Sequence, residues 1–288
     1  WRTIHGWEML KCPPPPTPET LFTDPRIAEF NRELAILEAF CPGSHEKLNS
    51  VHRFNPADPE EDCLLLNQLG LTWWWLWWMN NKEWNEFMCK SYELHSYGCR
   101  YLHMCMKVLG RHFEGQHWMT KNPNHIQYLL RLLNEFPKAN VIVTHRDPAK
   151  VVPSWSKILI YAHHQLIHND AMDPDAIPAL TTDGLGECLM EHFSYASKKL
   201  VQDREWLEQE QPEVARDQFF DVSFSKLTTD PVGQVKEIYS HFGYEYSDEF
   251  EAAMKAYLAE RPKTGVKYSL EGIGLTEEGI KENFADYI

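Results

Sequence analysis

The chain has 288 residues, of which 43% are hydrophobic and 24% are charged, and it carries a formal net charge of −14 at pH 7. This length suits one sizeable α/β domain, and the composition excludes a disordered chain. The acidic balance argues against nucleic acid as a partner, because binding to a phosphate backbone requires a basic face. We therefore expect one globular domain, residues 1–288.

The cysteine pattern indicates a reducing compartment. The seven cysteines include no C-x-x-C pair, and the chain has no N-x-S/T sequon. Scattered cysteines in odd number are typical of reduced thiols in a chain of this size. We expect a cytoplasmic protein, although the first residue is Trp1 rather than Met, which leaves an N-terminal targeting segment open.

The N-terminal region begins with a proline-rich stretch, residues 1–23, in which Pro13 to Pro16 are consecutive. Four prolines without a repeat favour a stiff surface connection, and a partner-binding motif is the less favoured alternative. Asp24-Pro25 then starts a helix, and Cys41-Pro42-Gly43 ends it.

His52 lies in a loop-like stretch, and Pro59-Glu60-Glu61-Asp62-Cys63 starts another helix with acidic residues in its first turn. Leu64 to Met79 follows and contains Trp73-Trp74-Trp75-Leu76-Trp77-Trp78. The stretch is short for a membrane span and contains polar residues, so we expect a buried core helix and no membrane span. Alternatively, these indoles line a pocket for an apolar acceptor, or form an interface in a homo-oligomer or larger assembly.

Two groups of histidine and cysteine residues have spacings that raise the question of a metal site. They are His95, Cys99 and His103 in one group, and His163, His164 and His168 in the other. The first group recurs every four residues, which spreads it too far along a helix axis for all three side chains to meet one ion. The second lies in an ordinary amphipathic segment. We therefore expect no metal.

The stretch from Trp118 to Ser156 has the strongest indication of function. Its apolar run Val141-Ile142-Val143 is followed by polar His145-Arg146-Asp147, as expected for a central strand of a parallel sheet. Asp147-Pro148 supplies an N-cap and a proline at the first helical position, so a helix starts directly after the strand. Asn122-Pro123 gives a second helix start of the same kind.

Four polar side chains accompany these two helix starts, whose N-termini attract anions. Arg146 and Ser154 could hold a phosphate between a guanidinium fork and a hydroxyl, beside free backbone N–H groups. Lys121 directly precedes the other helix, and His125 lies in its first turn. We expect all four at one edge of the sheet, around a phosphate-containing ligand.

The C-terminal half has three further elements. The pattern predicts a long amphipathic helix over Glu187 to Glu210, a strand over Phe219 to Phe224, and a helix that Thr229-Asp230-Pro231 caps and Gly243 ends. Arg261 to Tyr268 is a basic, glycine-containing loop in an otherwise acidic chain, and its simplest interpretation is a solvated turn.

These motifs resemble those of the sulfotransferases that use 3'-phosphoadenosine 5'-phosphosulfate (PAPS), in particular the bacterial-type group. The similar elements are Lys121-Asn122-Pro123-Asn124-His125, Arg146-Asp147-Pro148 with Ser154 eight residues beyond the arginine, and Lys226 to Pro231. Trp7-Glu8-Met9 and the Pro59 to Cys63 segment extend the resemblance towards the N-terminus. It implies a helix-rich α/β fold of the P-loop-NTPase-like sulfotransferase type, with a central parallel sheet flanked by helices.

The resemblance implies a role for several residues. Arg146 and Ser154 would bind the 3'-phosphate of PAPS, and Lys263 or Lys267 in the late basic loop would make a second contact to it. The donor would be the co-substrate, no metal would be needed, and the acceptor would be a hydroxyl or amine of a small molecule or glycan.

The same resemblance implies the groups that act on the transferring sulfuryl. Lys121 would lie near it, and His125 is the candidate general base, since a histidine can take up a proton at neutral pH. His52 is the runner-up. Asn122 stands where the family usually has serine.

The family's phosphate loop, G-x-x-[RK]-[ST]-G-[TS]-[TS], occurs nowhere in the 288 residues. We expect this loop and its strand upstream of Trp1. The alternative is a catalytically inactive sulfotransferase-like scaffold or subunit of a larger assembly. A P-loop nucleotide kinase would explain the strand and its arginine, but not the spacing of Arg146 and Ser154 together with the Lys121 element.

Overall fold

The computed structural model describes residues 23–40, 42–52, 55, 60–69, 86–87, 89–110, 117–166, 182–260 and 269–288. Several sequence predictions lie outside these residues and stay predictions. They concern the prolines 13–16, the tryptophan-rich run 73–78, His168, and the lysines Lys263 and Lys267.

Helices make up most of the described structure, and their bounds follow in chain order. They are α2 (Pro25–Phe40), α3 (Ser44–Val51), α4 (Cys63–Leu66), α7 (Tyr92–Gly110), α8 (Leu129–Glu135), α9 (Pro148–Leu166), α10 (Thr182–Glu210), α11 (Pro212–Asp217), α12 (Phe224–Thr229), α13 (Pro231–Phe242), α14 (Asp248–Glu260) and α15 (Glu277–Asn283). The short 3₁₀ helices are η2 (Asn67–Leu69), η3 (Pro123–Gln127) and η6 (Glu271–Ile273).

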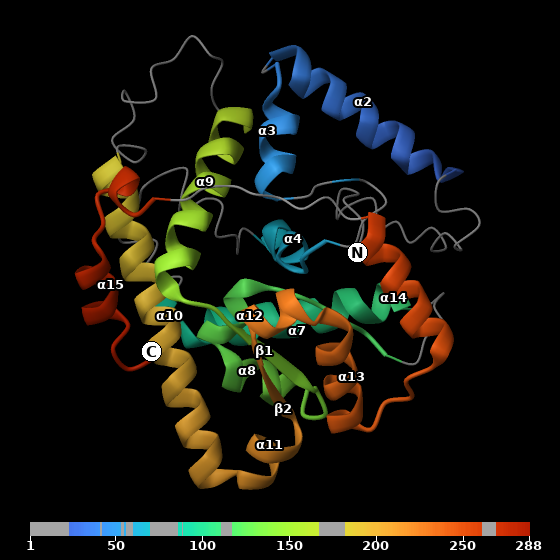
Figure 1. Cartoon of the computed structure of the whole chain (residues 1–288), viewed down its shortest axis with the longest axis vertical. Helices are drawn as coiled ribbons and strands as arrows, with labels where there is room; N and C mark the ends of the chain where they lie inside the picture. The colour runs from blue at the N-terminus through green and yellow to red at the C-terminus, as the bar shows by residue number, and fades with distance from the viewer. Residues whose placement is uncertain are drawn as a thin grey trace.

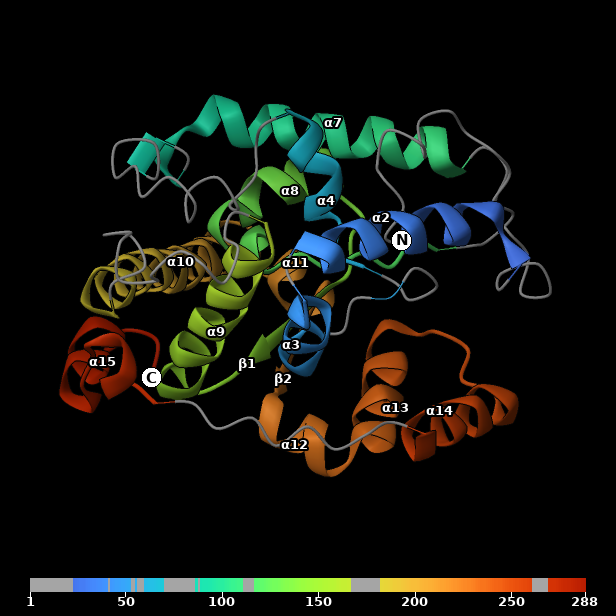
Figure 2. The same cartoon turned by 90° about the horizontal axis from the view of Figure 1, so that it is seen from above.

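Two parallel strands lie at the centre of the molecule. They are β1 (Val141–His145) and β2 (Phe219–Ser223), and Val141 is opposite Phe219 in their register. Figure 1 places them between α10 and α13, and Figure 2 shows α7 and α8 on one side of them with α12 and α13 on the other. The fold is therefore α/β with a parallel sheet flanked by helices, as expected.

The burial of β1 is less complete than a central strand would have. Val143 is buried, whereas Ile142 is 38% exposed. The reason is that β1 pairs with a single strand, β2, within the described part of the chain. The predicted parallel strand is confirmed, but its expected burial on both faces is wrong for these residues.

Three apolar clusters hold the helices around the strands. One joins α9, α10 and α15 around Val152 and Leu189, and a second joins α8, α10 and both strands around Leu129 and Phe219. The third packs α4 on α7 through side chains that include Leu65. This third cluster is small, but it fixes the segment that precedes α4.

The predicted helix ends agree with the structure at most positions. Asp230 caps α13, because its carboxylate accepts the Gly233 N–H at 2.9 Å, and Gly243 ends that helix with a φ of +69°. Two boundaries differ. Helix α10 begins at Thr182, earlier than predicted, and β2 ends at Ser223, so that Phe224 starts α12.

The position of the acidic residues before α4 also differs from the prediction. They were expected in the first turn of a helix, but α4 begins only at Cys63, and Asp62 makes no side-chain cap. Their carboxylates contact basic side chains elsewhere in the chain. Interactions with distant residues therefore replace the expected interaction with the helix dipole.

Candidate functional site

Arg146 follows β1 directly and leads into α9, at the carboxyl end of the parallel strands. Its guanidinium carbon lies 4.5 Å from the centre of the Phe224 ring, at the start of the helix that follows β2. Its Nε atom is buried without a hydrogen-bond partner among the described residues. A buried guanidinium N–H without a partner is costly, and an anion beside Arg146 would remove that cost.

The start of α9 offers fewer backbone donors than the sequence suggested. The Asp147 carboxylate accepts the Ala149 N–H at 2.9 Å, and the Asp147 carbonyl accepts the N–H groups of Lys150 and Val151. Pro148 has no N–H. The start of α9 therefore offers fewer free backbone N–H groups beside Arg146 than expected, because those of residues 149–151 are occupied.

Ser154 lies one and a half turns into α9 and is partly buried. Its hydroxyl makes no hydrogen bond to a described residue, whereas the nearby Ser156 donates to the Pro153 carbonyl at 2.8 Å. Arg146, just before α9, and Ser154, within it, therefore both retain hydrogen-bonding capacity. Whether they bind one phosphate stays a prediction.

The other candidate residues are brought together by Glu60, Glu61 and Asp62, which we call the acidic tripeptide. Each of its three carboxylates contacts a different basic residue of the sequence prediction. Glu60 contacts His52, Glu61 contacts Lys121, and Asp62 contacts His125. This arrangement comes from the tertiary fold, because the last two pairs join segments about 60 residues apart.

The pair of His52 and Glu60 is the more exposed of the two histidine–carboxylate pairs. The His52 Nε2 atom lies 3.3 Å from a Glu60 carboxylate oxygen, and the histidine side chain is 31% exposed. The hydrogen bond to Glu60 raises the pKa of His52 above its ordinary value. Burial alone would raise the pKa of Glu60, but the contacts to His52 and to the Glu61 N–H outweigh it and lower that pKa.

Lys121 is held at its backbone and at its ammonium group. The Asp62 N–H donates to the Lys121 carbonyl at 3.0 Å, and the ammonium donates to the Glu61 carboxylate. The lysine side chain is nevertheless 69% exposed, whereas Glu61 is mostly buried. An exposed ammonium is screened by water, so this ion pair leaves Lys121 able to contact a stronger anion.

His125 lies in η3 beside the most buried carboxylate of the tripeptide. Its Nε2 atom is 3.3 Å from the Asp62 carboxylate, and the two side chains are 15% and 0% exposed. The edge of its ring faces Tyr128, with ring centres 5.6 Å apart. The site thus holds one histidine in a nearly enclosed position and another, His52, at its rim.

Helix α10 supports η3 from the other side. The amide of Gln127, the last residue of η3, lies 3.0 Å from the Nε2 atom of buried His192. Burial lowers the pKa of His192 to about 3, so the imidazole is neutral. The Gln127 amide nitrogen can only donate, so His192 Nε2 accepts and its proton is on Nδ1.

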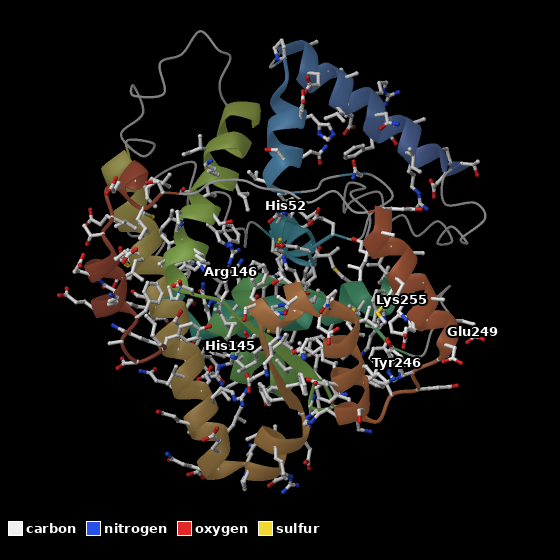
Figure 3. The ribbon with its side chains drawn as sticks, viewed as in Figure 1. His52, His145, Arg146, Tyr246, Glu249 and Lys255 are labelled. Carbon is white, nitrogen blue, oxygen red and sulfur yellow. The ribbon has the colours of Figure 1, made fainter. Side chains whose placement is uncertain are left out.

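The two groups of candidate residues lie on the same side of the strands. Helix α3, which ends next to His52, packs against α9, which starts after Arg146. Figure 3 shows both labelled side chains above the strands, on the side where β1 ends. Sequence reasoning missed Phe224 and the contacts of the acidic tripeptide, although an aromatic residue at the end of a parallel strand was an available signal.

A separate hollow of about 290 Å³ lies between the strands and α10. It is lined by His145 and Asp221, which are 2.8 Å apart, and by Arg204 and Tyr287, which complete their hydrogen bonds. His145, Asp221 and Tyr287 satisfy one another, whereas the Arg204 Nε atom is buried without a hydrogen-bond partner among the described residues. None of the site residues predicted from the sequence lines this hollow.

The described residues contain no group of three or more histidine, cysteine or acidic side chains placed to hold a metal ion. In α7, His103 lies 2.6 Å from the Glu135 carboxylate, and the His95 ring packs on Tyr128. No helix among them is both long and apolar enough to cross a membrane.

The fold is α/β, with Arg146 directly after the first of two parallel strands, at the edge of the sheet where ligands bind in folds of this kind. The sequence profile of the sulfotransferase family matches residues 9–248. The chain therefore belongs to the sulfotransferase family.

Two solved structures share this fold over 98% of the chain and 68% of their own lengths. Sulfotransferase STF9 from Mycobacterium avium has a TM-score of 0.77 at 25% identity. Sulfotransferase STF1 from Mycobacterium tuberculosis H37Rv has a TM-score of 0.73 at 24% identity and supports the fold alone.

Two curated relatives match in sequence, the omega-hydroxy-beta-dihydromenaquinone-9 sulfotransferases Stf3 of Mycobacterium bovis and Mycobacterium tuberculosis. Each is 28% identical over 142 residues, which is 49% of this chain and 32% of the relative. The chain thus spans about a third of the length of the curated relatives it matches.

Proposed function

We propose that this chain is the part of a PAPS-dependent sulfotransferase that holds the distal phosphate of the donor and the base for the acceptor. The observation that carries the proposal is Arg146, a guanidinium at the carboxyl end of β1 with a buried Nε that lacks a partner. Ser154, on the helix that starts there, supplies a hydroxyl. Lys263 or Lys267 supplies a further cation to the same phosphate.

In this mechanism the acceptor oxygen or nitrogen attacks sulfur in line with the leaving group. The bond from sulfur to the 5'-phosphate oxygen breaks, and its electron pair leaves with the phosphate. Lys121 stabilises the negative charge on the sulfuryl oxygens, and His125 takes the acceptor proton. His52 is the second candidate for that proton, with the more exposed position at the rim.

The phosphate loop and its strand complete the donor site upstream of Trp1, in one domain with residues 1–288. The acceptor is a hydroxyl or amine of a small molecule or glycan. The names of the curated relatives specify an omega-hydroxy-dihydromenaquinone, so we favour a hydroxyl on an apolar acceptor as the first class to test.

The test compares two nucleotides that differ only in the 3'-phosphate. 3'-Phosphoadenosine 5'-phosphate should raise the melting temperature of the full-length protein more than adenosine 5'-phosphate does. Arg146→Ala should weaken binding of the first nucleotide by about 10- to 100-fold, as expected for one charged hydrogen bond, and should abolish the discrimination. Arg216→Ala is the control, because Arg216 is exposed and paired with Asp217.

Each outcome has a distinct meaning. If the wild-type protein shows no response to 3'-phosphoadenosine 5'-phosphate, the proposal is wrong, and the inactive scaffold becomes the better interpretation. If Arg146→Ala weakens the binding of both nucleotides equally, Arg146 does not bind the 3'-phosphate. Transfer of ³⁵S from labelled PAPS to a panel of alcohols and amines then identifies the acceptor class.

A further inference from the structure

Asp62 is a buried carboxylate that the mechanism above does not use. It is 0% exposed, and its Oδ1 atom accepts the Asn122 amide at 2.8 Å and faces His125 Nε2 at 3.3 Å. Its Oδ2 atom has no hydrogen-bond partner among the described residues, and neither has His125 Nε2, whose contact to Asp62 has the distance of an ion pair but not the alignment of a hydrogen bond. A buried charge is costly unless it is paired, so the chain retains Asp62 at a stability cost that a function would explain.

Asn122 does two things at once. Its Oδ1 atom caps η3 by accepting the Asn124 N–H at 2.9 Å, and its Nδ2 atom donates to Asp62. A serine could accept the same N–H, but it has one polar atom where asparagine has two on separate arms. The asparagine at this position is therefore matched to the carboxylate opposite it.

The surroundings fix this pair in place. The Asp62 N–H is bonded to the Lys121 carbonyl, and Leu65, in the next helix, is buried against α7. The His125 ring also packs edge-on with Tyr128, with ring centres 5.6 Å apart. The Asp62 carboxylate and the His125 ring are thus placed from both backbone and side chains, as a preorganised pair requires.

We propose that Asp62 is a positioning residue whose carboxylate, 3.3 Å from His125 Nε2, keeps the imidazole proton on that nitrogen, so that Nδ1 carries the lone pair that takes the acceptor proton. The inference rests on the proposed function. The acceptor O–H proton goes to Nδ1 as the oxygen forms its bond to sulfur, and the electrons of the broken bond leave with the 5'-phosphate. The Asp62 carboxylate then lies beside the imidazolium that results, where the opposite charges attract.

The comparison with Glu60 supports this choice of pair. Glu60 is 8% exposed and its partner His52 is 31% exposed, against 0% and 15% for Asp62 and His125. A carboxylate with less solvent has a stronger field at its partner. Asp62 is therefore the less screened of the two carboxylates, whereas Glu60 is the one that makes a hydrogen bond to its histidine.

The test uses a graded series at position 62 in the full-length protein. Asp62→Asn keeps an acceptor oxygen without the charge, and Asp62→Ala removes both. The assay uses ³⁵S-labelled PAPS and an acceptor found by the transfer assay described under Proposed function. The kcat should fall about 10-fold in the first variant and about 100-fold in the second, since general base catalysis supplies a rate enhancement of about 10²- to 10⁴-fold. The Kd for 3'-phosphoadenosine 5'-phosphate should be unchanged.

A second readout needs no nucleotide. With ¹⁵N-labelled histidine, and the His125→Gln spectrum for assignment, His125 should be protonated on Nε2 in the wild type and should populate both neutral forms in Asp62→Ala. Asn122→Ser keeps the cap of η3 and loses the donor to Asp62. Its fraction of His125 protonated on Nε2 should lie between those of wild type and Asp62→Ala. Glu135→Gln is the matched control, because it removes a carboxylate from the His103 pair.

The outcomes separate the two proposals. Protonation of His125 on Nδ1 in the wild type, or an unchanged spectrum and kcat in Asp62→Ala, would overturn the role of Asp62. If Asp62→Ala does not fold, the other two variants decide the question. A kcat equal to that of the wild type in both Asp62→Asn and Asn122→Ser would then overturn the role of Asp62. Absence of nucleotide binding in the wild type refutes the proposed function, and with it the catalytic part of this inference, whatever the spectrum shows.

Discussion

The buried His192 predicts a specific loss of stability in acid. It is 4% exposed, and its Nε2 atom accepts the Gln127 amide that holds η3 against α10. Burial lowers its pKa from 6.5 to about 3. Below pH 6.5 the unfolded chain takes up a proton at this histidine, whereas the folded chain does not, so the unfolded state is favoured as the pH falls.

The magnitude follows from the two pKa values. Each pH unit between them is worth about 1.4 kcal/mol, so the free energy of unfolding should fall by about 2 kcal/mol from this residue alone between pH 6.5 and pH 5. The loss continues until the pH reaches about 3. Protonation at Nε2 would also break the bond to Gln127 and release the 3₁₀ helix that carries His125.

The measurement is urea denaturation of wild type and His192→Gln at four values between pH 7.5 and pH 5. Glutamine keeps an acceptor for Gln127 but has no titrating group, so the difference in free energy of unfolding between the proteins should shrink steadily as the pH falls. His117→Gln, which changes an exposed histidine, should not show this trend. If the difference in free energy of unfolding between wild type and His192→Gln stays constant across this pH range, the reasoning is refuted.

Two further predictions concern packing and a titrating pair. Gly186→Ala should destabilise the fold by about 1–3 kcal/mol in urea denaturation, because the added methyl would lie 1.9 Å from the Ile273 carbonyl oxygen. Gly272→Ala should cost little, because its methyl would meet Ser269 at an ordinary contact distance of 3.7 Å. Equal free energies of unfolding for the two variants would contradict this. The difference in free energy of unfolding between wild type and Glu60→Gln should be larger at pH 6 than at pH 9. The reason is that the pKa of His52 is raised in the folded protein, so the pair with Glu60 stabilises the fold below about pH 6.5 and this gain is lost as the pH rises. A larger difference at pH 9 would exclude the pair as the source.

Local sequence signals predicted much of the architecture. Asp147-Pro148 and Asp230-Pro231 mark helix starts through contacts within three residues, so their caps could be read directly. The strand at Val141 was likewise visible as a short apolar run. These features depend on neighbours in the chain, and sequence patterns describe neighbours well.

The site was only partly predictable for the opposite reason. His125, Lys121 and His52 were found through motifs, but their carboxylate partners were assigned to a helix start by the same local rules. The pairs of Asp62 with Asn122 and of Glu61 with Lys121 span 60 residues, and no periodicity marks such a contact. The occupied N–H groups at the start of α9 were missed because the Asp147 cap that satisfies one of them was counted as a helix signal only.

The acidic tripeptide has a consequence for how this protein tolerates change in loop length. Its three carboxylates come from three consecutive residues, so their spacing is limited by the reach of that short backbone segment. A single inserted or deleted residue between Glu60 and Asp62 would shift at least one carboxylate out of reach of its partner. Homologous recombination or loop grafting across this point would therefore have to preserve its length to the residue, even where the surrounding sequence is freely exchanged.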